Sequence, residues 1–304
     1  AVTERTSMIV MQAADLSVSS AELTAKDGGS VDLSIATDAD AQTVTFTAPT
    51  VLQPGEYTIA STYKGVIQTQ ANGLFALDYK NLEGQPARAL FTQFEPGDAR
   101  RFMPLWDEPA YKATVNLSAT VPAAEMPVSN MPATGSTDNG NGTKTVTFAT
   151  TPKMSSYLLF FSVGDFERVT KMQGPTEIGI VMTRGKTDQA TYALDASAEI
   201  VGYYNDYFGM DYPLPKLDNV AAPGQSQFFG AMENWGAIFY FETALLLDPA
   251  ISTDQNRRGV YGTVAHEIAH QWFGNLVTMS WWDDLWLNEG FASWITTKVT
   301  QQFH

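Results

Sequence analysis

The residues with the clearest chemical potential are His266, Glu267 and His270, which stand in the pattern His-Glu-x-x-His within an apolar run. Residues four apart on an α-helix lie one turn above each other, so the two imidazoles can offer nitrogens to one metal ion. The pattern therefore indicates a zinc site with an adjacent carboxylate. Two surface histidines are the alternative interpretation, but only His304 of the three histidines lies outside the motif.

A third zinc ligand is expected at Glu289, which follows far enough downstream for a loop and the return of a second helix. Two histidines and one glutamate leave a fourth position open for water, whereas a structural zinc site is closed by a protein ligand that is usually cysteine. The chain has no cysteine. Apolar neighbours predict that Glu289 lies on a buried helix, where a carboxylate needs a partner such as a metal. These neighbours are Trp282, Trp286, Leu287, Phe291 and Trp294. We expect one Zn²⁺ per chain.

Glu267 is the expected general base of such a site. Zinc lowers the pKa of a bound water toward about 7. A carboxylate hydrogen-bonded to this water can take its proton as the water attacks a peptide carbonyl, and can then pass the proton to the leaving amine. A solvated helix glutamate is the alternative interpretation, which the flanking histidines disfavour.

Three sequence blocks resemble the zinc aminopeptidases of the aminopeptidase N type, which belong to the gluzincins. The first block runs from His266 to Trp294 and includes LNEGFA at 287–292. The second is GAMEN at 230–234, which matches the family's Gly-x-Met-Glu-Asn exopeptidase motif. The third is QFEP at 93–96, followed by DEP at 107–109, and it resembles the segment that gives a second contact to the substrate's amino terminus.

The resemblance implies a zinc enzyme that removes N-terminal amino acids from peptides with a free amino terminus. Glu233 and Glu95 would bind the substrate's α-ammonium group, which would fix the scissile bond one residue from the chain end. The other substrate-binding residues implied by the motif are Gly230, Ala231, Met232 and Asn234, with the backbone of the first three lying along the peptide. On residue type alone, Glu233 and Glu95 are turn glutamates, which are more often solvated.

The spacing of apolar residues predicts an all-β domain at 1–184 and the first part of an α+β catalytic domain at 185–304. The first prediction depends on strand-like alternation. This alternation occurs at Val31–Ile35, Thr43–Thr47, Tyr57–Ile59, Ala113–Leu117 and Thr145–Phe148. By resemblance, the first domain is a saddle-like sheet and the second is thermolysin-like.

Helical spacing in the second domain predicts a helix over 187–209. The zinc motif is predicted on a later helix that runs from Ser252 to about Phe273. Its first turn would be stabilised by Ser252 and Gln255, which form a Ser-x-x-Gln capping box. Short strands are expected between the two helices, at 217–222 and 237–241.

Composition excludes several classes of function. A formal net charge of −15 opposes binding to nucleic acid and to acidic lipid surfaces. No run reaches the roughly 18 apolar residues that a membrane span needs. A serine or cysteine hydrolase is disfavoured, because the chain has neither Gly-x-Ser-x-Gly nor cysteine. The sequence indicates no particular oligomeric state. It indicates no particular compartment either, since a chain without cysteine suits the cytoplasm, the periplasm and secretion alike.

Three alternatives stand beside the aminopeptidase. A zinc endopeptidase shares the metal site but ignores whether the substrate amine is free. A leukotriene-type epoxide hydrolase shares much of the framework, and a non-catalytic scaffold would require a broken site. Among the aromatic residues, Phe229 is expected either in the core or in the wall of the first side-chain pocket. Trp281, Trp282 and Trp286 are expected in the core.

The resemblance covers only part of the family's pattern. The family's tyrosine that stabilises the tetrahedral intermediate would lie beyond His304, and the front is short by one or more strands. We therefore expect a fragment that binds zinc weakly, aggregates and has little activity alone. Its second helix is expected to leave apolar side chains without a partner. These side chains are Trp286, Phe291, Ile295 and Val299.

Overall fold

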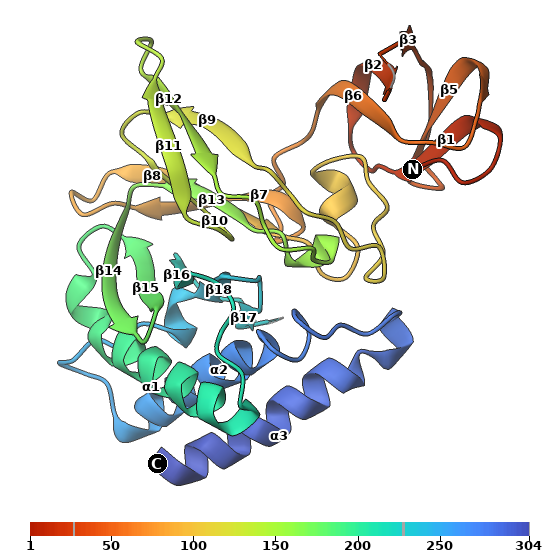
Figure 1. Ribbon diagram of the computed structural model, residues 1–304. Helices are drawn as coiled ribbons and strands as arrows, with labels where there is room; N and C mark the ends of the chain where they lie inside the picture. The colour runs from red at the N-terminus through yellow and green to blue at the C-terminus, as the bar shows by residue number, and fades with distance from the viewer. Residues whose placement is uncertain (27, 227–228, 304) are drawn as a thin grey trace.

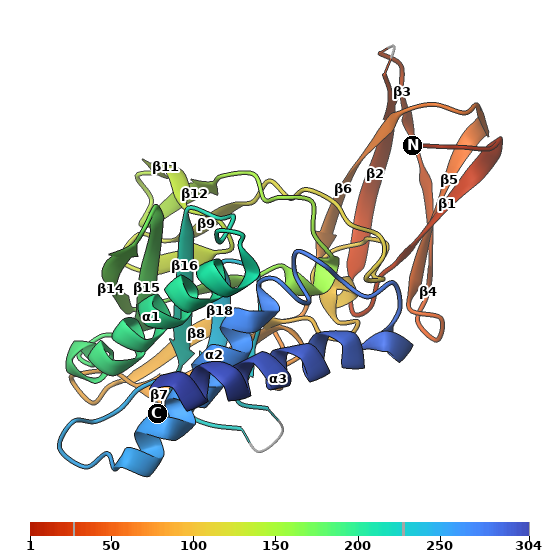
Figure 2. The ribbon, with the colours of Figure 1, turned by 60° about the horizontal axis from the view of Figure 1, so that its bottom comes forward.

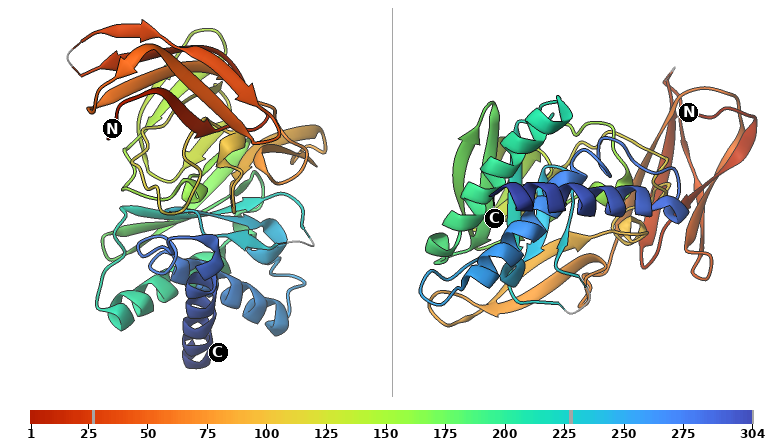
Figure 3. Two further views of the ribbon diagram at one scale, coloured as in Figure 1. Left: turned by 90° about the vertical axis from the view of Figure 1, so that its right-hand side faces the viewer. Right: turned by 90° about the horizontal axis from the view of Figure 1, so that it is seen from below.

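The computed structural model describes residues 1–26, 28–226 and 229–303 (Figure 1). Three parts follow one another along the chain: an N-terminal β-sandwich, a middle β layer, and a sheet covered by helices. The left view of Figure 3 shows the sandwich and the helices at opposite ends of the molecule, with the middle layer between them. The predicted order, an all-β part followed by a mixed part that carries the zinc motif, is confirmed.

The N-terminal β-sandwich consists of two three-stranded antiparallel sheets, ordered β1-β5-β4 and β3-β2-β6. The strands are β1 (Thr6–Gln12), β2 (Ser17–Ala25), β3 (Ser30–Asp32), β4 (Ser34–Asp38), β5 (Thr43–Leu52) and β6 (Tyr57–Lys64). Alternate residues of a strand point to one face, so Val44 and Phe46 of β5 are both buried between the sheets with Leu23. The strand predicted over 31–35 is divided at Leu33, whose side chain joins this core.

The middle β layer contains a four-stranded sheet, ordered β10-β13-β8-β7, and a three-stranded sheet, ordered β11-β12-β9. The strands are β7 (Gly73–Lys80), β8 (Pro86–Gln93), β9 (Ser118–Pro122), β10 (Met126–Ser129), β11 (Ala133–Asp138), β12 (Thr143–Phe148) and β13 (Phe161–Gly164). The strand predicted over 113–117 is wrong. Those residues form one isolated bridge, from Ala113 to Met154, and regular pairing begins only at Ser118.

The third part is built on a five-stranded mixed sheet, ordered β14-β15-β16-β18-β17. The strands are β14 (Phe166–Gln173), β15 (Thr176–Thr183), β16 (Lys216–Ala222), β17 (Ala231–Met232) and β18 (Ala237–Phe241). The predicted division at 184/185 runs through this sheet, because β15 precedes it in the sequence and pairs in parallel with β16 after it. The unit that carries the zinc motif therefore extends back to Phe166.

One continuous apolar core joins the middle layer to this mixed sheet. Phe239 of β18 meets Phe75 of β7 and Phe91 of β8 edge-on, with ring centroids 6.1 and 5.7 Å apart. Aromatic pairs in this geometry contribute about 0.5–1.5 kcal/mol beyond the area they bury. The strand that leads away from the GAMEN segment is thus held rigidly against the preceding layer.

Three helices lie on the opposite face of the mixed sheet: α1 (Thr191–Phe208), α2 (Asp254–His270) and α3 (Trp286–Phe303) (Figure 2). The predicted end of α1 is confirmed, because Gly209 takes a left-handed conformation with a φ of 62°. Helix α1 packs along β14 and β15, and α2 packs between α1 and α3. None of the helices in the described ranges has the length and apolarity of a membrane span.

The N-cap of the helix that carries the zinc motif lies one residue later than predicted. This residue is Thr253, whose Oγ1 accepts a hydrogen bond from the Asn256 backbone N–H at 3.3 Å, while Asn256 Oδ1 accepts from the Thr253 N–H at 2.9 Å. Ser252 lies outside this box, because its own N–H donates to Asp248 O in the preceding turn. The helix ends at His270, before the predicted Phe273, since the chain closes a turn there.

Replacing Thr253 with alanine should lower the free energy of unfolding by about 1 kcal/mol, the usual contribution of an N-cap side chain. Ser252→Ala is the matched control and should change it by less than about 0.5 kcal/mol. Urea denaturation of the two variants beside the parent chain measures both values. A larger loss for Ser252→Ala would restore the cap to the position predicted from the sequence.

The apolar residues of α3 divide into a covered and an uncovered face. Ile295 and Val299 are fully buried, because they lie on the face that packs on α2, so the expectation that they lack a partner is wrong. Trp286, by contrast, is 66% exposed, and Trp281 is 47% exposed, so the prediction that both lie in the core is also wrong. Trp282 is half-buried and packs edge-on against Tyr157 at 5.2 Å.

Candidate metal centre

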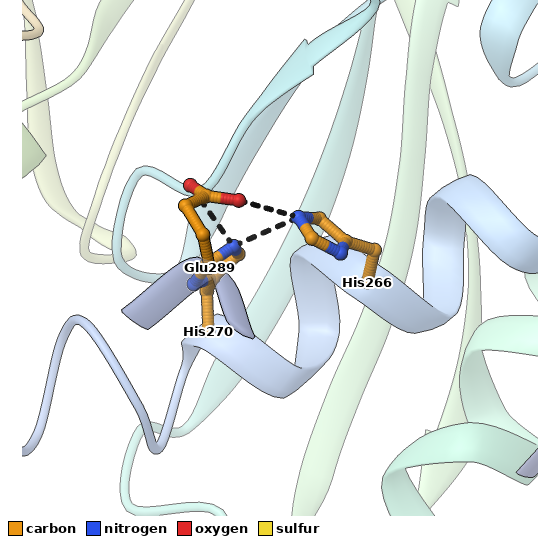
Figure 4. A group of neighbouring side chains, drawn as sticks. All are labelled: His266, His270 and Glu289. Atoms are coloured by element: carbon orange, nitrogen blue, oxygen red, sulfur yellow. Dashed lines mark hydrogen bonds and ion pairs between the residues drawn. The ribbon is translucent and has the colours of Figure 1, made fainter. Parts of the chain in front are cut away.

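Three side chains from two helices converge at one point. His266 and His270 rise from the last turn of α2, and Glu289 comes from the first turn of α3 (Figure 4). His266 Nε2 lies 3.0 Å from His270 Nε2 and 3.1 Å from Glu289 Oε2, and His270 Nε2 lies 3.6 Å from Glu289 Oε1. Within the described ranges, this is the one group of three or more such side chains whose ligand atoms converge.

The spacing of these atoms fits a zinc ion. Nitrogen and oxygen ligands at 2.0–2.2 Å in a tetrahedron lie roughly 3.3–3.6 Å apart, close to the separations found here. His270 Nδ1–H donates to Phe273 O at 2.9 Å, which leaves Nε2 with its lone pair directed toward the other two groups. The donor set therefore matches zinc in type, number and distance.

Glu289 is more accessible than its apolar neighbours predicted, since its side chain is 44% exposed. The prediction of a buried helix is wrong at this position, because the first turn of α3 projects past the end of α2. Hydrogen bonds from His266 and His270 hold the pKa of Glu289 far below its usual range. The carboxylate is consequently ionised at every pH where a metal ligand is needed.

Glu267, which lies between the two histidines, is buried on α2. Burial raises the pKa of Glu267 well above its usual range; the positive charge of His270 opposes this shift, and the negative charges of Glu233 and Glu289 add to it. A carboxyl group in such surroundings readily holds a proton. Position and environment both suit a group that takes up a proton and releases it again.

His270 lies among these negatively charged side chains. Burial by itself lowers the pKa of His270, but Glu233, the hydrogen bond to Glu289 and the charge of Glu267 together raise it to about 10. The surplus of negative charge around one imidazole indicates a site that attracts cations.

The GAMEN segment lies beside this cluster. Ala231 and Met232 form β17, the edge strand of the mixed sheet, which pairs antiparallel with β18. The next residue, Glu233, is only 3% exposed, and its Oε1 has no hydrogen-bond partner among the described residues. Gly230 is exposed, whereas Asn234 is fully buried and its amide donates to Leu159 O of the middle layer at 3.4 Å.

Glu95 reaches the same place from the middle layer, at the end of β8. Burial raises the pKa of Glu95 to about 8, with further contributions from the charges of Glu233 and Glu289, opposed by His270. Glu95 and Glu233 are thus two carboxyl groups that raise each other's demand for a positive charge, and Glu233 Oε1 has no hydrogen-bond partner among the described residues. Such a pair favours a bound positive charge.

Tyr157 is a residue at the site that sequence reasoning missed. It is buried, its hydroxyl donates to Gly274 O at 3.2 Å, and Asn288 Nδ2 donates to that hydroxyl at 3.4 Å. Burial, followed by the charges of Glu233, Glu95 and Glu289, raises the pKa of Tyr157 well above its usual range. The only sequence signal was its place in an apolar run, which indicates core packing and gives no sign of this contact.

Phe229, which precedes the GAMEN segment, packs against the aromatic core. Its ring centroid lies 5.8 Å from that of Phe239 and 5.4 Å from that of Phe241. The side chain is half-buried, so core packing accounts for this aromatic residue. His304 lies outside the described residues.

Comparisons with known proteins agree with these blocks. Residues 1–158 match the peptidase M1 N-terminal domain, and residues 192–304 match the peptidase family M1 domain. Aminopeptidase N of Acetobacter pasteurianus is 49% identical over 265 residues, which are 87% of this chain and 74% of that protein. Puromycin-sensitive aminopeptidase of Caenorhabditis elegans is 39% identical over 97% of this chain and 31% of its own length. Endoplasmic reticulum aminopeptidase 1 of Rattus norvegicus is 39% identical over 97% of this chain and 32% of its own length.

Proposed function

The chain belongs to peptidase family M1, and we propose that the protein carrying it is a zinc-dependent aminopeptidase that removes N-terminal residues from peptides. The observation that carries this proposal is the buried, unpartnered carboxylate oxygen of Glu233 beside the cluster of His266, His270 and Glu289. A group of metal-binding side chains alone would suit many hydrolases. A buried carboxylate next to that group suits a substrate whose end carries a positive charge, such as the α-ammonium group of a peptide.

His266, His270 and Glu289 would hold one Zn²⁺ through His266 Nε2, His270 Nε2 and the Glu289 carboxylate. At that site the ion would supply two things, namely polarisation of the peptide carbonyl and a water molecule acidic enough to act near neutral pH. Glu289 is kept ionised for this purpose by the two imidazoles. Phe273 O keeps His270 in the required tautomer by accepting the Nδ1 proton.

Glu267 acts as the general base. Its carboxylate takes a proton from the water that adds to the carbonyl carbon, and it then delivers that proton to the amide nitrogen as the carbon–nitrogen bond breaks. The buried surroundings that raise its pKa support both halves of this transfer. No other carboxyl group stands between the two histidines.

Glu233 and Glu95 would receive the substrate's α-ammonium group. Two carboxylates around one ammonium place the first peptide bond, and no later one, at the metal. The edge strand β17 would align the peptide, because Gly230, Ala231 and Met232 border the open edge of the sheet, where an extended chain can add as a further strand. Asn234 supports this segment from the side of the middle layer, because its Nδ2 donates a hydrogen bond to Leu159 O at 3.4 Å.

The metal assignment predicts about one zinc per chain, and its loss on His266→Ala or His270→Ala, because either change removes one of three protein ligands. Elemental analysis of the full-length protein that carries this chain, and of both variants, measures this. Thr263→Ala, on the same helix, is the control and should keep the parent's zinc content. Full zinc content in either histidine variant would move the metal elsewhere.

The choice of reaction is tested with a panel of substrates on the full-length protein that carries this chain. We expect rapid cleavage of unblocked aminoacyl amides, loss of that cleavage with a zinc chelator, and recovery on adding zinc. Preferential cleavage of internal peptide bonds would favour an endopeptidase. Activity on a lipid epoxide without aminoacyl amide cleavage would favour the epoxide hydrolase.

A further inference from the structure

Two buried amide side chains follow the metal-binding histidines along the chain. Gln271 comes directly after His270, and Asn275 lies one turn further on. Both side chains are fully buried. Neither can reach solvent, so their hydrogen-bonding partners within the protein define what they do.

Both amides donate to the same acceptor, the backbone carbonyl oxygen of Glu233. The distance is 3.1 Å from Gln271 Nε2 and 2.8 Å from Asn275 Nδ2. On its other side, Gln271 Oε1 accepts from the Gly236 backbone N–H at 3.2 Å and from the Tyr212 hydroxyl at 3.3 Å. The Gln271 side chain therefore forms hydrogen bonds with both ends of the turn of residues 233–236.

The two amides are themselves fixed to the backbone of the zinc motif. Gln271 Nε2 also lies 3.3 Å from Glu267 O, and the Asn275 backbone N–H donates to His270 O at 3.0 Å. The chain can close this turn because Gly274 adopts a φ of +129°, where a side chain would press on His270. The backbone of the proposed base and of one metal ligand is thereby linked through two side chains to the backbone of Glu233.

We propose that Gln271 and Asn275 are positioning residues that hold the Glu233 carboxylate at a set distance from the metal ligands. This inference rests on the proposed function, in which Glu233 binds the substrate's ammonium group. The distance between that anchor and the metal decides which peptide bond reaches Glu267. A misplacement of about 1 Å can cost a hundredfold in rate, so a link of this kind contributes to catalysis without touching the substrate.

The test is a double-mutant cycle in the full-length protein that carries this chain. Gln271→Met keeps the length of the side chain but removes its donor and acceptor, and Glu233→Gln keeps the shape but removes the charge that is being positioned. We expect Gln271→Met to lower kcat/KM for an unblocked aminoacyl amide about a hundredfold in the parent protein. In the Glu233→Gln background the same change should cost less than about threefold, because nothing remains to be positioned.

Two further measurements separate positioning from a general loss of stability. Zinc content should be unchanged by Gln271→Met. In its zinc-free form, the Gln271→Met variant should also lose the parent protein's preference for binding an aminoacyl amide over the N-acetylated form. The matched control is Asn219→Leu, which removes another fully buried amide that donates to Ser197 Oγ at 3.2 Å, away from the site. It should lower the melting temperature but keep kcat/KM within about threefold of the parent value.

Equal losses for Gln271→Met in both backgrounds, or a hundredfold loss for Asn219→Leu, would overturn the proposal while leaving the aminopeptidase assignment intact. Equal cleavage of free and acetylated substrates by the parent protein would remove that assignment, and the inference with it. If Gln271→Met does not fold, Asn275→Leu removes the other donor to Glu233 O and passes through the same cycle with the same expected results.

Discussion

Replacing Glu267 with glutamine in the full-length protein is expected to lower kcat at least a hundredfold while the zinc content stays at the parent value. Glutamine has the size of glutamate but cannot accept a proton, and general-base catalysis typically contributes 10²- to 10⁴-fold. Glu267 lies beside the metal ligands in sequence without being one of the three converging groups. Binding of the metal and chemistry should therefore separate in this variant.

Steady-state kinetics on an unblocked aminoacyl amide, paired with elemental analysis of the same sample, measures both quantities. Asp254→Asn is a suitable control, because it removes a carboxylate from the first, exposed turn of the same helix. Its turnover should match that of the parent protein. Near-normal turnover in Glu267→Gln would show that another group takes the proton.

Acetylating the amino terminus of a good substrate should abolish its cleavage, and Glu233→Ala should produce a comparable defect on the free substrate. The Glu233 carboxylate is almost completely buried and one of its oxygens is unpartnered. Truncating one member of a buried charge pair costs about 2–5 kcal/mol. That corresponds to roughly 30- to 5,000-fold in kcat/KM.

The comparison between free and acetylated peptides supplies the control within one experiment. Glu233→Ala should bring cleavage of the free substrate down toward the level of the acetylated one, because the variant no longer has the carboxylate that distinguishes them. The same variant should keep its zinc, since Glu233 is not among the converging ligands. Equal cleavage of both peptides by the parent protein would instead support a zinc endopeptidase.

The convergence of His266, His270 and Glu289 was the most predictable feature of this protein. Spacing along one helix brings His266 and His270 together without any knowledge of the fold, because a helix has a fixed pitch. The contacts between distant segments were not predictable. Gln271 and Tyr157 meet residues that are far from them in sequence, and no local pattern marks a side chain whose partner lies in another layer.

Errors in the predicted fold have the same origin. Residues 113–117 alternate like a strand, yet among the described residues no strand pairs with them in regular register, and alternation alone does not provide a partner. The apolar stripe of α3 was visible in the sequence, but which side of the helix faces α2 was not. As a result Ile295 and Trp286 were assigned the same environment, although one is buried and the other is exposed.

The parallel pairing of β15 with β16 has a consequence for how this catalytic unit can be divided. A chain that began after residue 184 would keep the metal ligands but lose β14 and β15, two of the five strands of the sheet beneath them. Strand β16, fully buried along its length in the intact sheet, would become a bare edge with a row of unpaired N–H and C=O groups. Such an edge is a template for pairing between molecules, so a separate unit with this metal centre must start no later than Phe166.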